Sequence, residues 1–531
     1  MPEGVPATRP PSMLRSAGII SFFVGLSRLL GLIRELALAR FLGAGFYSDA
    51  YVTAYRIPNL LRDLFAEGAL SAAFIPAYTQ ARQDGGREAA HRLASRVLSV
   101  LVVVLSVLIV IGIVGAGLLV RKMAPGFEPD KAALTIVLTR IMMPFLALVS
   151  FAAVAMGMLN AEGEFGRPAS AQSVFNVVAI AGAIVLWMMG LPPYQVAVGW
   201  SIATLVGGLA QLLIQLPPLY AQGWRFRFDW APGDPAVRRL GAQMAPAVFG
   251  MAAVQVNIFV STLFLSKDDG AITWLQLAFR LLYLPIGLFG VALGTVATTS
   301  LARQAATGDI SGLGATVQRA LRNLAFLTVP STVGLMLLAE PIVRLLFNHG
   351  RFAERPENAP NTAAALAIYS VGLVAYASVK VLAPAFYAMG QPRAPLVASA
   401  SAVAANVATV VLLHPYLGFG GIAAGLVVST FVNVLVLGLV LRQRVGPVPG
   451  PGIAGFAIRV GVATAAMGVV VHFGAGALAA RLGIASTLAQ AIVTFVPIAA
   501  GAALYFALAW ALHVPEAVTL FGTIRRRLQR S

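Results

Sequence analysis

The 531-residue chain contains no cysteine and few charged side chains. Without cysteine it can form no disulfide, thiolate metal site or cysteine nucleophile. Charged residues make up 11% of the chain, against about 25% in an ordinary soluble protein. Hydrophobic residues make up 59%, and the mean hydropathy is +0.83. There is too little polar side chain to cover a water-facing surface, so a soluble enzyme is excluded and a polytopic membrane protein is indicated.

Acidic residues are scarce beside basic ones, with 20 Asp and Glu against 38 Lys and Arg and a formal net charge of +18. In so apolar a chain, this excess sets membrane topology and attracts anionic lipid, and we expect no nucleic-acid partner. The sequence has no GxxxxGK[ST] nucleotide motif, and its five histidines are scattered. We therefore expect no ATP hydrolysis, no catalytic residue and no metal cluster.

Long apolar runs are plentiful. A helix needs about 20 mostly apolar residues to cross a bilayer, and windows of that length predict an all-α membrane protein of about fourteen transmembrane helices. The expected spans are 16–38, 48–76, 93–120, 133–158, 168–189, 195–216, 240–265, 271–300, 320–346, 363–388, 395–413, 420–441, 455–477 and 486–511. An even number places both termini on one side. A roughly two-to-one excess of arginine and lysine on that side predicts that it is the cytoplasm.

The two halves of the chain resemble each other at an offset of about 224 residues. Ala54-Tyr55-Arg56 aligns with Ala278-Phe279-Arg280, and Asn176 and Asn406 follow at similar distances. Such a parallel repeat predicts two pseudo-symmetric six-helix lobes followed by a C-terminal helix pair. The expected parts are a cytoplasmic N-terminal tail (1–15), an N-lobe (16–222), a cytoplasmic linker (223–239), a C-lobe (240–445), a helix pair (446–515) and a basic cytoplasmic tail (516–531).

Arginines stand out in the first two spans. A charge at the bilayer centre costs about 2.5–3.5 kcal/mol, so Arg28, Arg34 and Arg62 are expected to face a polar interior. Arg280 in the eighth span is the repeat equivalent of Arg56 and has no acid one helical turn away. Guanidinium groups bind phosphate oxygens in pairs and keep their charge when buried. Arg28, Arg34, Arg62 and Arg280 therefore predict an anionic substrate with a diphosphate head.

Other charged residues leave two interpretations open. Asp49, Arg56 and Asp63 are spaced seven apart and share one stripe of the second span, so they fit structural ion pairs as well as functional groups. Lys380 is a single cation inside the tenth span. A substrate contact and a structural role explain it equally well.

Several segments closely resemble the MurJ (MviN) family of lipid II flippases, within the multidrug/oligosaccharidyl-lipid/polysaccharide exporter superfamily. They include SRLLGLIREL at 27–36, PNLLRDLFAEGALSAAFIP at 58–76 and FRLLYLPIGLFGVALGT at 279–295, and the resemblance covers essentially the whole chain. It implies a carrier in the bacterial inner membrane that uses alternating access. The substrate would be undecaprenyl-diphosphate-linked disaccharide-pentapeptide, moved to the outer leaflet for peptidoglycan synthesis.

The same resemblance implies roles for individual residues. It makes Arg28, Arg34, Arg62 and Arg280 the substrate-binding residues of the cavity. It makes Asp49 and Glu67 gate or ion-pair residues, and the last two spans a groove for the polyprenyl tail. The implied partners are lipid II, membrane lipids and peptidoglycan-synthesis proteins.

The energy source and three other functions stay open. Some members of that family bind sodium through carboxylates in the second lobe, whereas spans eleven and twelve here offer Asn406 and Asn433 but no acid. We expect no cofactor, and coupling either to the membrane potential or to a monovalent cation. The alternatives are an exporter of another lipid-linked oligosaccharide of O-antigen type and a scaffold that recruits peptidoglycan enzymes. A cation antiporter is disfavoured by the positive charge of the cavity.

Overall fold

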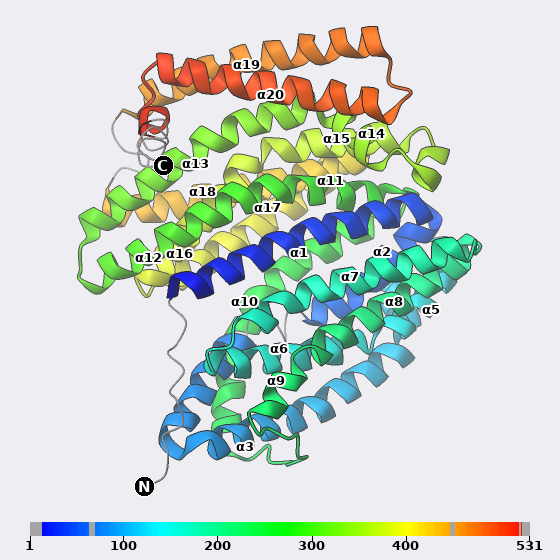
Figure 1. Cartoon of the computed structure of the whole chain (residues 1–531), viewed down its shortest axis with the longest axis vertical. Helices are drawn as coiled ribbons and strands as arrows, with labels where there is room; N and C mark the ends of the chain where they lie inside the picture. Colours follow the sequence, from blue (N-terminus) through cyan, green and yellow to red (C-terminus); the bar gives the residue numbers. More distant parts are fainter. Residues whose placement is uncertain (1–12, 63–69, 447–451, 520–521, 523–531) are drawn as a thin grey trace. The chain divides into compact units, whose positions relative to one another are not determined.

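A computed structural model describes residues 13–62, 70–446, 452–519 and 522, and within these ranges the secondary structure is helical, without strands (Figure 1). The chain divides into two units, Met1–Gln255 (unit 1) and Val256–Ser531 (unit 2), which are described separately. Unit 1 contains α1 (Met13–Leu42), α2 (Phe46–Arg62), α3 (Ser71–Val114), α4 (Ala116–Met123), α5 (Pro129–Met142), α6 (Phe145–Ala161), α7 (Gly166–Met188), α8 (Pro193–Leu213), α9 (Leu216–Ala221) and most of α10 (Pro235–Leu265).

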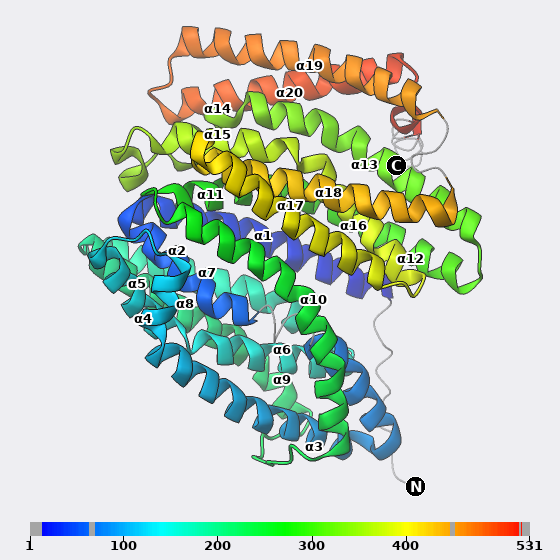
Figure 2. The same ribbon diagram turned by 180° about the vertical axis from the view of Figure 1, so that it is seen from behind.

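Unit 2 begins within α10 and ends with an antiparallel helix pair (Figure 2). Its elements are α11 (Ala271–Pro285), the π-helix η2 (Ile286–Val291), α12 (Ala292–Ala306), α13 (Ile310–Leu337), α14 (Ala339–Phe347), the 3₁₀-helix η3 (Gly350–Glu354), α15 (Asn358–Val371), α16 (Leu373–Ala388), α17 (Arg393–Leu417), α18 (Phe419–Val445), α19 (Ile453–Leu482) and α20 (Thr487–Ala511). The pair α19 and α20 packs against α13 and α14.

Every expected span coincides, within the described residues, with a helix or a run of helices. Ten of these are long and apolar enough to cross a membrane, and α15 with α16, bent by 45°, makes an eleventh. The expected spans outside this set are 16–38, 48–76 and 240–265. Each of these three spans includes residues outside the part of the chain whose side chains the structure describes, and the described part of the third contains the apolar stretch Gln255–Leu265 of α10. The prediction of an all-α polytopic membrane protein is confirmed.

Both units use the same helix pairings. In unit 1, α2 packs on α5, α3 on α6, and α7 on α8. In unit 2, the repeat-related pairings are α11 on α15, α13 on α16, and α17 on α18. If the spans are counted within each repeat, the second span packs on the fourth, the third also packs on the fourth, and the fifth packs on the sixth. The sequence repeat is therefore also a repeat of packing.

Individual contacts follow the repeat as well. The ring of Tyr55 in α2 lies 5.7 Å from that of Phe145 in α6, and the ring of Phe279 in α11 lies 5.6 Å from that of Tyr369 in α15. Adding the repeat offset of about 224 residues to Tyr55 and Phe145 leads to Phe279 and Tyr369. An aromatic contact between the second and fourth spans is thus present in each unit.

A second repeated contact involves the asparagines noted in the sequence. Asn176 Nδ2 in α7 donates to the backbone oxygen of Ser27 in α1 at 3.1 Å. Asn406 Nδ2 in α17 donates to Asn257 Oδ1 in α10 at 3.0 Å. Both asparagines are buried, so each amide joins the fifth span of its repeat to the first by a hydrogen bond away from solvent.

Glycine shapes the helices at two positions. Gly86 has a φ of 73°, a left-handed conformation that glycine adopts without steric cost, and it kinks α3 near its first third. In α12, a Cβ added at Gly294 would lie 2.6 Å from the backbone oxygen of Lys380 in α16. Only glycine allows α12 and α16 to approach this closely.

Candidate functional site

Arg34 is the predicted substrate-binding arginine whose contacts the structure defines. It lies on α1, and its side chain is 13% exposed. Its Nη2 donates to Glu35 Oε1 at 2.9 Å, and its guanidinium carbon lies 5.3 Å from the centroid of the Phe175 ring in α7. A carboxylate and an aromatic face together hold the guanidinium in place. The charge of Arg34 is therefore balanced by an acid adjacent in sequence.

Aromatic side chains from α2, α6 and α8 extend this environment. Tyr51 stacks on Tyr55 with ring centroids 6.2 Å apart and meets Trp200 edge to face. The Tyr51 hydroxyl is hydrogen-bonded to Thr204 Oγ1 at 2.9 Å. This aromatic cluster was missed in the sequence, although Tyr51 and Tyr55 are one helical turn apart and so share a face of α2.

The other predicted residues of α1 and α2 are only partly defined. Arg28 is half-buried on α1, two turns before Arg34, and Arg56 is half-buried on α2. Arg62 is the last residue of α2 and is also half-buried. Glu67, like Asp63, lies outside the described residues. In unit 1 the arginines predicted to bind substrate therefore lie on two successive helices, α1 and α2.

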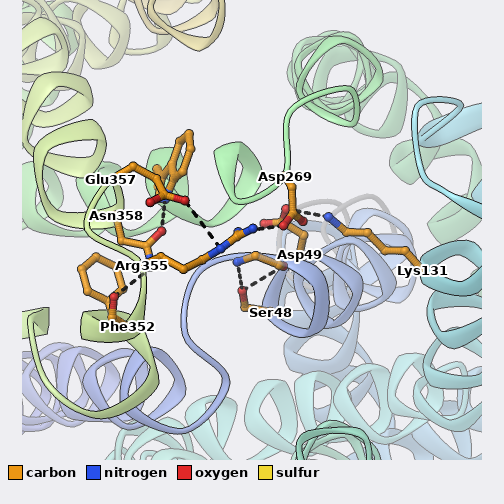
Figure 3. A network of polar contacts seen from close by, with 10 residues as sticks. Ser48, Asp49, Lys131, Asp269, Phe352, Arg355, Glu357 and Asn358 are labelled. Carbon is orange, nitrogen blue, oxygen red and sulfur yellow. Dashed lines mark hydrogen bonds and ion pairs between the residues drawn. The ribbon is translucent and has the colours of Figure 1, made fainter.

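Asp49 forms a buried ion pair that the sequence did not predict. Lys131 Nζ lies 2.9 Å from Asp49 Oδ2, with side-chain exposures of 6% and 0% (Figure 3). The Lys131 ammonium also lies 4.5 Å from the centroid of the Phe127 ring. The sequence placed Lys131 in an outer loop, whereas it belongs to the first turn of α5. This pair ties the start of α2 to the start of α5.

Unit 2 has an ion pair at the repeat-related position. Arg355, just before α15, lies 2.7 Å from Asp269 and 3.5 Å from Glu357 (Figure 3). Beside it the buried Asn358 accepts a hydrogen bond from Trp274 Nε1 at 2.8 Å and donates to the backbone oxygen of Phe352 at 2.9 Å. As in unit 1, a cation at the start of the fourth span binds an acid near the start of the second.

The predicted cations of unit 2 have different environments. Arg280 is half-buried on α11. Its neighbour Phe279 contacts the rings of Tyr283, Tyr369 and Tyr376 at 5.6–5.8 Å. Lys380 lies on α16, and its side chain is exposed on unit 2. Arg280 thus follows a residue of an aromatic cluster in the sequence and is half-buried, whereas the Lys380 side chain is exposed.

In unit 2, the helices in which some family members have cation-binding carboxylates carry side-chain amides instead. Asn406 and Asn257 bond to each other, and Asn433 is half-buried on α18. Among the described residues no three His, Cys, Asp or Glu side chains converge in a way that could hold a metal ion.

Similar proteins fall in one family. The family model described as lipid II flippase MurJ matches residues 38–494. A lipid II flippase MurJ from Burkholderia cenocepacia is 34% identical over 521 residues, which cover 94% of this chain and 98% of that protein.

Solved structures share the fold. A structure titled "Lipid II flippase MurJ, inward closed conformation" matches with a TM-score of 0.77 and 23% identity, over 93% of this chain and 99% of that one. An inward-facing MATE multidrug transporter of the MOP superfamily matches with a TM-score of 0.67 and 16% identity, over 79% and 94%. At these identities the structural matches establish the fold, and the sequence matches establish the family. The chain belongs to the lipid II flippase MurJ family.

Proposed function

We propose that this protein is a lipid II flippase of the bacterial inner membrane. It would carry undecaprenyl-diphosphate-linked disaccharide-pentapeptide from the inner to the outer leaflet for peptidoglycan synthesis. The observation that carries the proposal is the enclosure of Arg34 on α1 of a MurJ-family chain, between Glu35 and Phe175. A guanidinium held by Glu35 and Phe175 is oriented in advance for a phosphate ligand.

The proposed binding residues are Arg28, Arg34, Arg62 and Arg280. A diphosphate offers more acceptor oxygens than one guanidinium can satisfy, so several arginines would share it. Asp49, Arg56 and Glu67 would serve as gate or ion-pair residues, and Lys380 would be a further contact. The helices α19 and α20 would hold the polyprenyl tail.

Alternating access is the proposed mechanism. Two repeats with the same internal pairings are the usual basis for such motion, because each can move largely as a rigid body. Both termini would lie in the cytoplasm. Peptidoglycan-synthesis proteins are proposed as further partners.

The membrane potential is the proposed energy source, with a monovalent cation as the other candidate. Moving one charge across 100 mV is worth about 2.3 kcal/mol, and the proposed cavity is rich in cations. In proteoliposomes, a potassium diffusion potential should change the transport rate, and replacing sodium with choline should not. A rate that follows sodium alone would refute this part of the proposal.

Complementation tests the function. Cells depleted of their own lipid II flippase would express the intact chain, Arg34→Ala, Arg280→Ala, or Arg140→Ala as a control for an exposed arginine on α5. We expect rescue by the intact chain and by Arg140→Ala only, at equal protein levels. Failure of the correctly inserted intact chain would favour an exporter of another lipid-linked oligosaccharide. Rescue by every variant would refute the arginine site.

A further inference from the structure

Unit 1 contains an apolar cavity that the proposed transport function does not use. Its volume is about 190 Å³, and it lies between α3, α6, the end of α8 and α9. The side chains around it are almost entirely apolar. They include Leu98, Phe151, Met158, Leu216, Trp224 and Phe226. The cavity is open on one side, and its apolar walls favour hydrocarbon over water.

The residues between α9 and α10 form one wall of this cavity and continue beyond it. This α9–α10 linker (222–234) contains the sequence WRFRFDW at 224–230, in which aromatic and charged side chains alternate. Phe226, Phe228 and Trp230 are 44%, 61% and 49% exposed. Exposed aromatic rings interleaved with arginine are typical of the membrane–water interface. The linker therefore has the composition of a segment that lies among lipid headgroups.

The linker carries two arginines and two aspartates, but both aspartates bind an arginine outside it. Its acids are used within unit 1, since Arg96 Nε binds Asp229 Oδ2 at 2.8 Å and Arg96 Nη1 also binds Asp234. Arg225 donates only to the backbone oxygens of Tyr220 and Trp224, at 2.8 Å each, and lies over the Tyr220 ring. Within the described part of the chain, neither Arg225 nor Arg227 forms an ion pair. Both guanidinium groups are available to an anion.

Trp224 forms part of the cavity wall. Its side chain lines the cavity and is only 4% exposed. Its indole Nε1–H is buried and has no hydrogen-bond acceptor among the described residues. Buried indole N–H groups normally have an acceptor. This nitrogen is closed off from solvent and therefore from a molecule in the cavity, so Trp224 contributes its apolar ring surface to the wall.

We propose that unit 1 binds an anionic phospholipid at the α9–α10 linker. Part of one acyl chain lies in the apolar cavity, and the headgroup phosphate binds Arg225 and Arg227. The occupant is a phospholipid because the site joins a hydrocarbon-sized cavity to a pair of unpaired guanidinium groups, which a neutral lipid would leave unsatisfied. This site uses none of the proposed substrate-binding arginines, and it does not depend on the transported substrate.

Tryptophan quenching tests the site. The intact chain and Trp224→Phe would be reconstituted in phosphatidylcholine vesicles containing a minor fraction of acyl-brominated lipid, either phosphatidylglycerol or phosphatidylcholine. The difference between the two proteins isolates the signal of Trp224. We expect stronger quenching of Trp224 by brominated phosphatidylglycerol than by brominated phosphatidylcholine. Arg225→Gln with Arg227→Gln should weaken the apparent affinity for phosphatidylglycerol about tenfold.

Two further variants separate the headgroup from the chain. Arg303→Gln with Arg319→Gln removes the same charge from exposed positions of unit 2 and should leave the preference for phosphatidylglycerol unchanged. Ala155→Leu fills the cavity and should reduce quenching by both lipids. Equal quenching by the two lipids, absence of Trp224 quenching, or an equal effect of the control pair would each overturn the proposal.

Discussion

At the scale of single residues, two ion pairs of unit 1 differ in how far apart their members lie in the sequence. Arg34 pairs with the adjacent Glu35, whereas Asp49 pairs with Lys131. The cost of burying a charge identified Arg34 as a residue that needs polar surroundings, and the structure places it against Glu35 and Phe175. The partner of Asp49 could not be predicted in the same way. Lys131 is 82 residues away in sequence, and helical periodicity relates only residues on one helix.

The buried pair of Asp49 and Lys131 makes a prediction about stability. Lys131→Met removes the cation that lies 2.9 Å from the Asp49 carboxylate, and breaking a buried ion pair costs about 3–5 kcal/mol. We expect a lower midpoint of thermal unfolding in detergent, measured by the loss of the monodisperse chromatographic peak.

The control for this change is an exposed pair, Glu340 with Arg344 on α14, whose side chains are 55% and 31% exposed. Breaking an exposed pair costs about 0–1 kcal/mol, so Arg344→Met should leave the midpoint nearly unchanged. Equal midpoints for Lys131→Met and the intact chain would show that the buried pair does not stabilise unit 1.

At the scale of helices, apolar windows predicted where the chain crosses the membrane better than where its helices bend. Hydropathy sums over a window and therefore locates spans, but it contains nothing about backbone breaks. The break between α15 and α16 and the π-helix at Ile286–Val291 both lie inside single predicted spans. Pro285 immediately precedes the π-helix, and Gly372 stands at the break between α15 and α16. Each irregularity therefore has a local signal that an average over an apolar window does not register.

The approach of α12 to α16 makes a prediction at this scale. Gly294→Ala places a methyl group 2.6 Å from the Lys380 backbone oxygen, so the two helices must separate, at a cost of about 1–3 kcal/mol. Gly334→Ala on α13 is the matched control, because nothing lies within 4 Å of its added Cβ. We expect Gly294→Ala to lower the unfolding midpoint and Gly334→Ala to keep or raise it. The opposite order would contradict the close packing of α12 on α16.

At the scale of the whole molecule, the sequence repeat predicted the repeated packing of the two units. Matching residues such as Tyr55 and Phe279 proved to make matching contacts. The predicted segment boundaries and the positions of the termini stay predictions. How the charged residues of the two repeats meet a substrate could not be predicted, because it depends on long-range packing that local patterns do not contain.

The orientation in the membrane can be tested because the chain has no cysteine of its own. Positive-inside bias predicts that Gly233 in the α9–α10 linker is cytoplasmic and that Ala485, between α19 and α20, is outside. In intact spheroplasts, a membrane-impermeant maleimide should label Ala485→Cys at once and Gly233→Cys only after permeabilisation. The reverse pattern would place both termini outside.

The central claim is that arginines in apolar helices carry a lipid-linked diphosphate across the membrane. Purified protein would be reconstituted in liposomes with a fluorescent lipid II analogue, and its appearance in the other leaflet would be followed by a membrane-impermeant quencher. The account predicts transport by the intact chain and by Arg140→Ala, and a loss of about tenfold or more for Arg34→Ala, since each lost charge-assisted contact is worth about 1.5–3 kcal/mol. Equal rates for the intact chain and Arg34→Ala would contradict it.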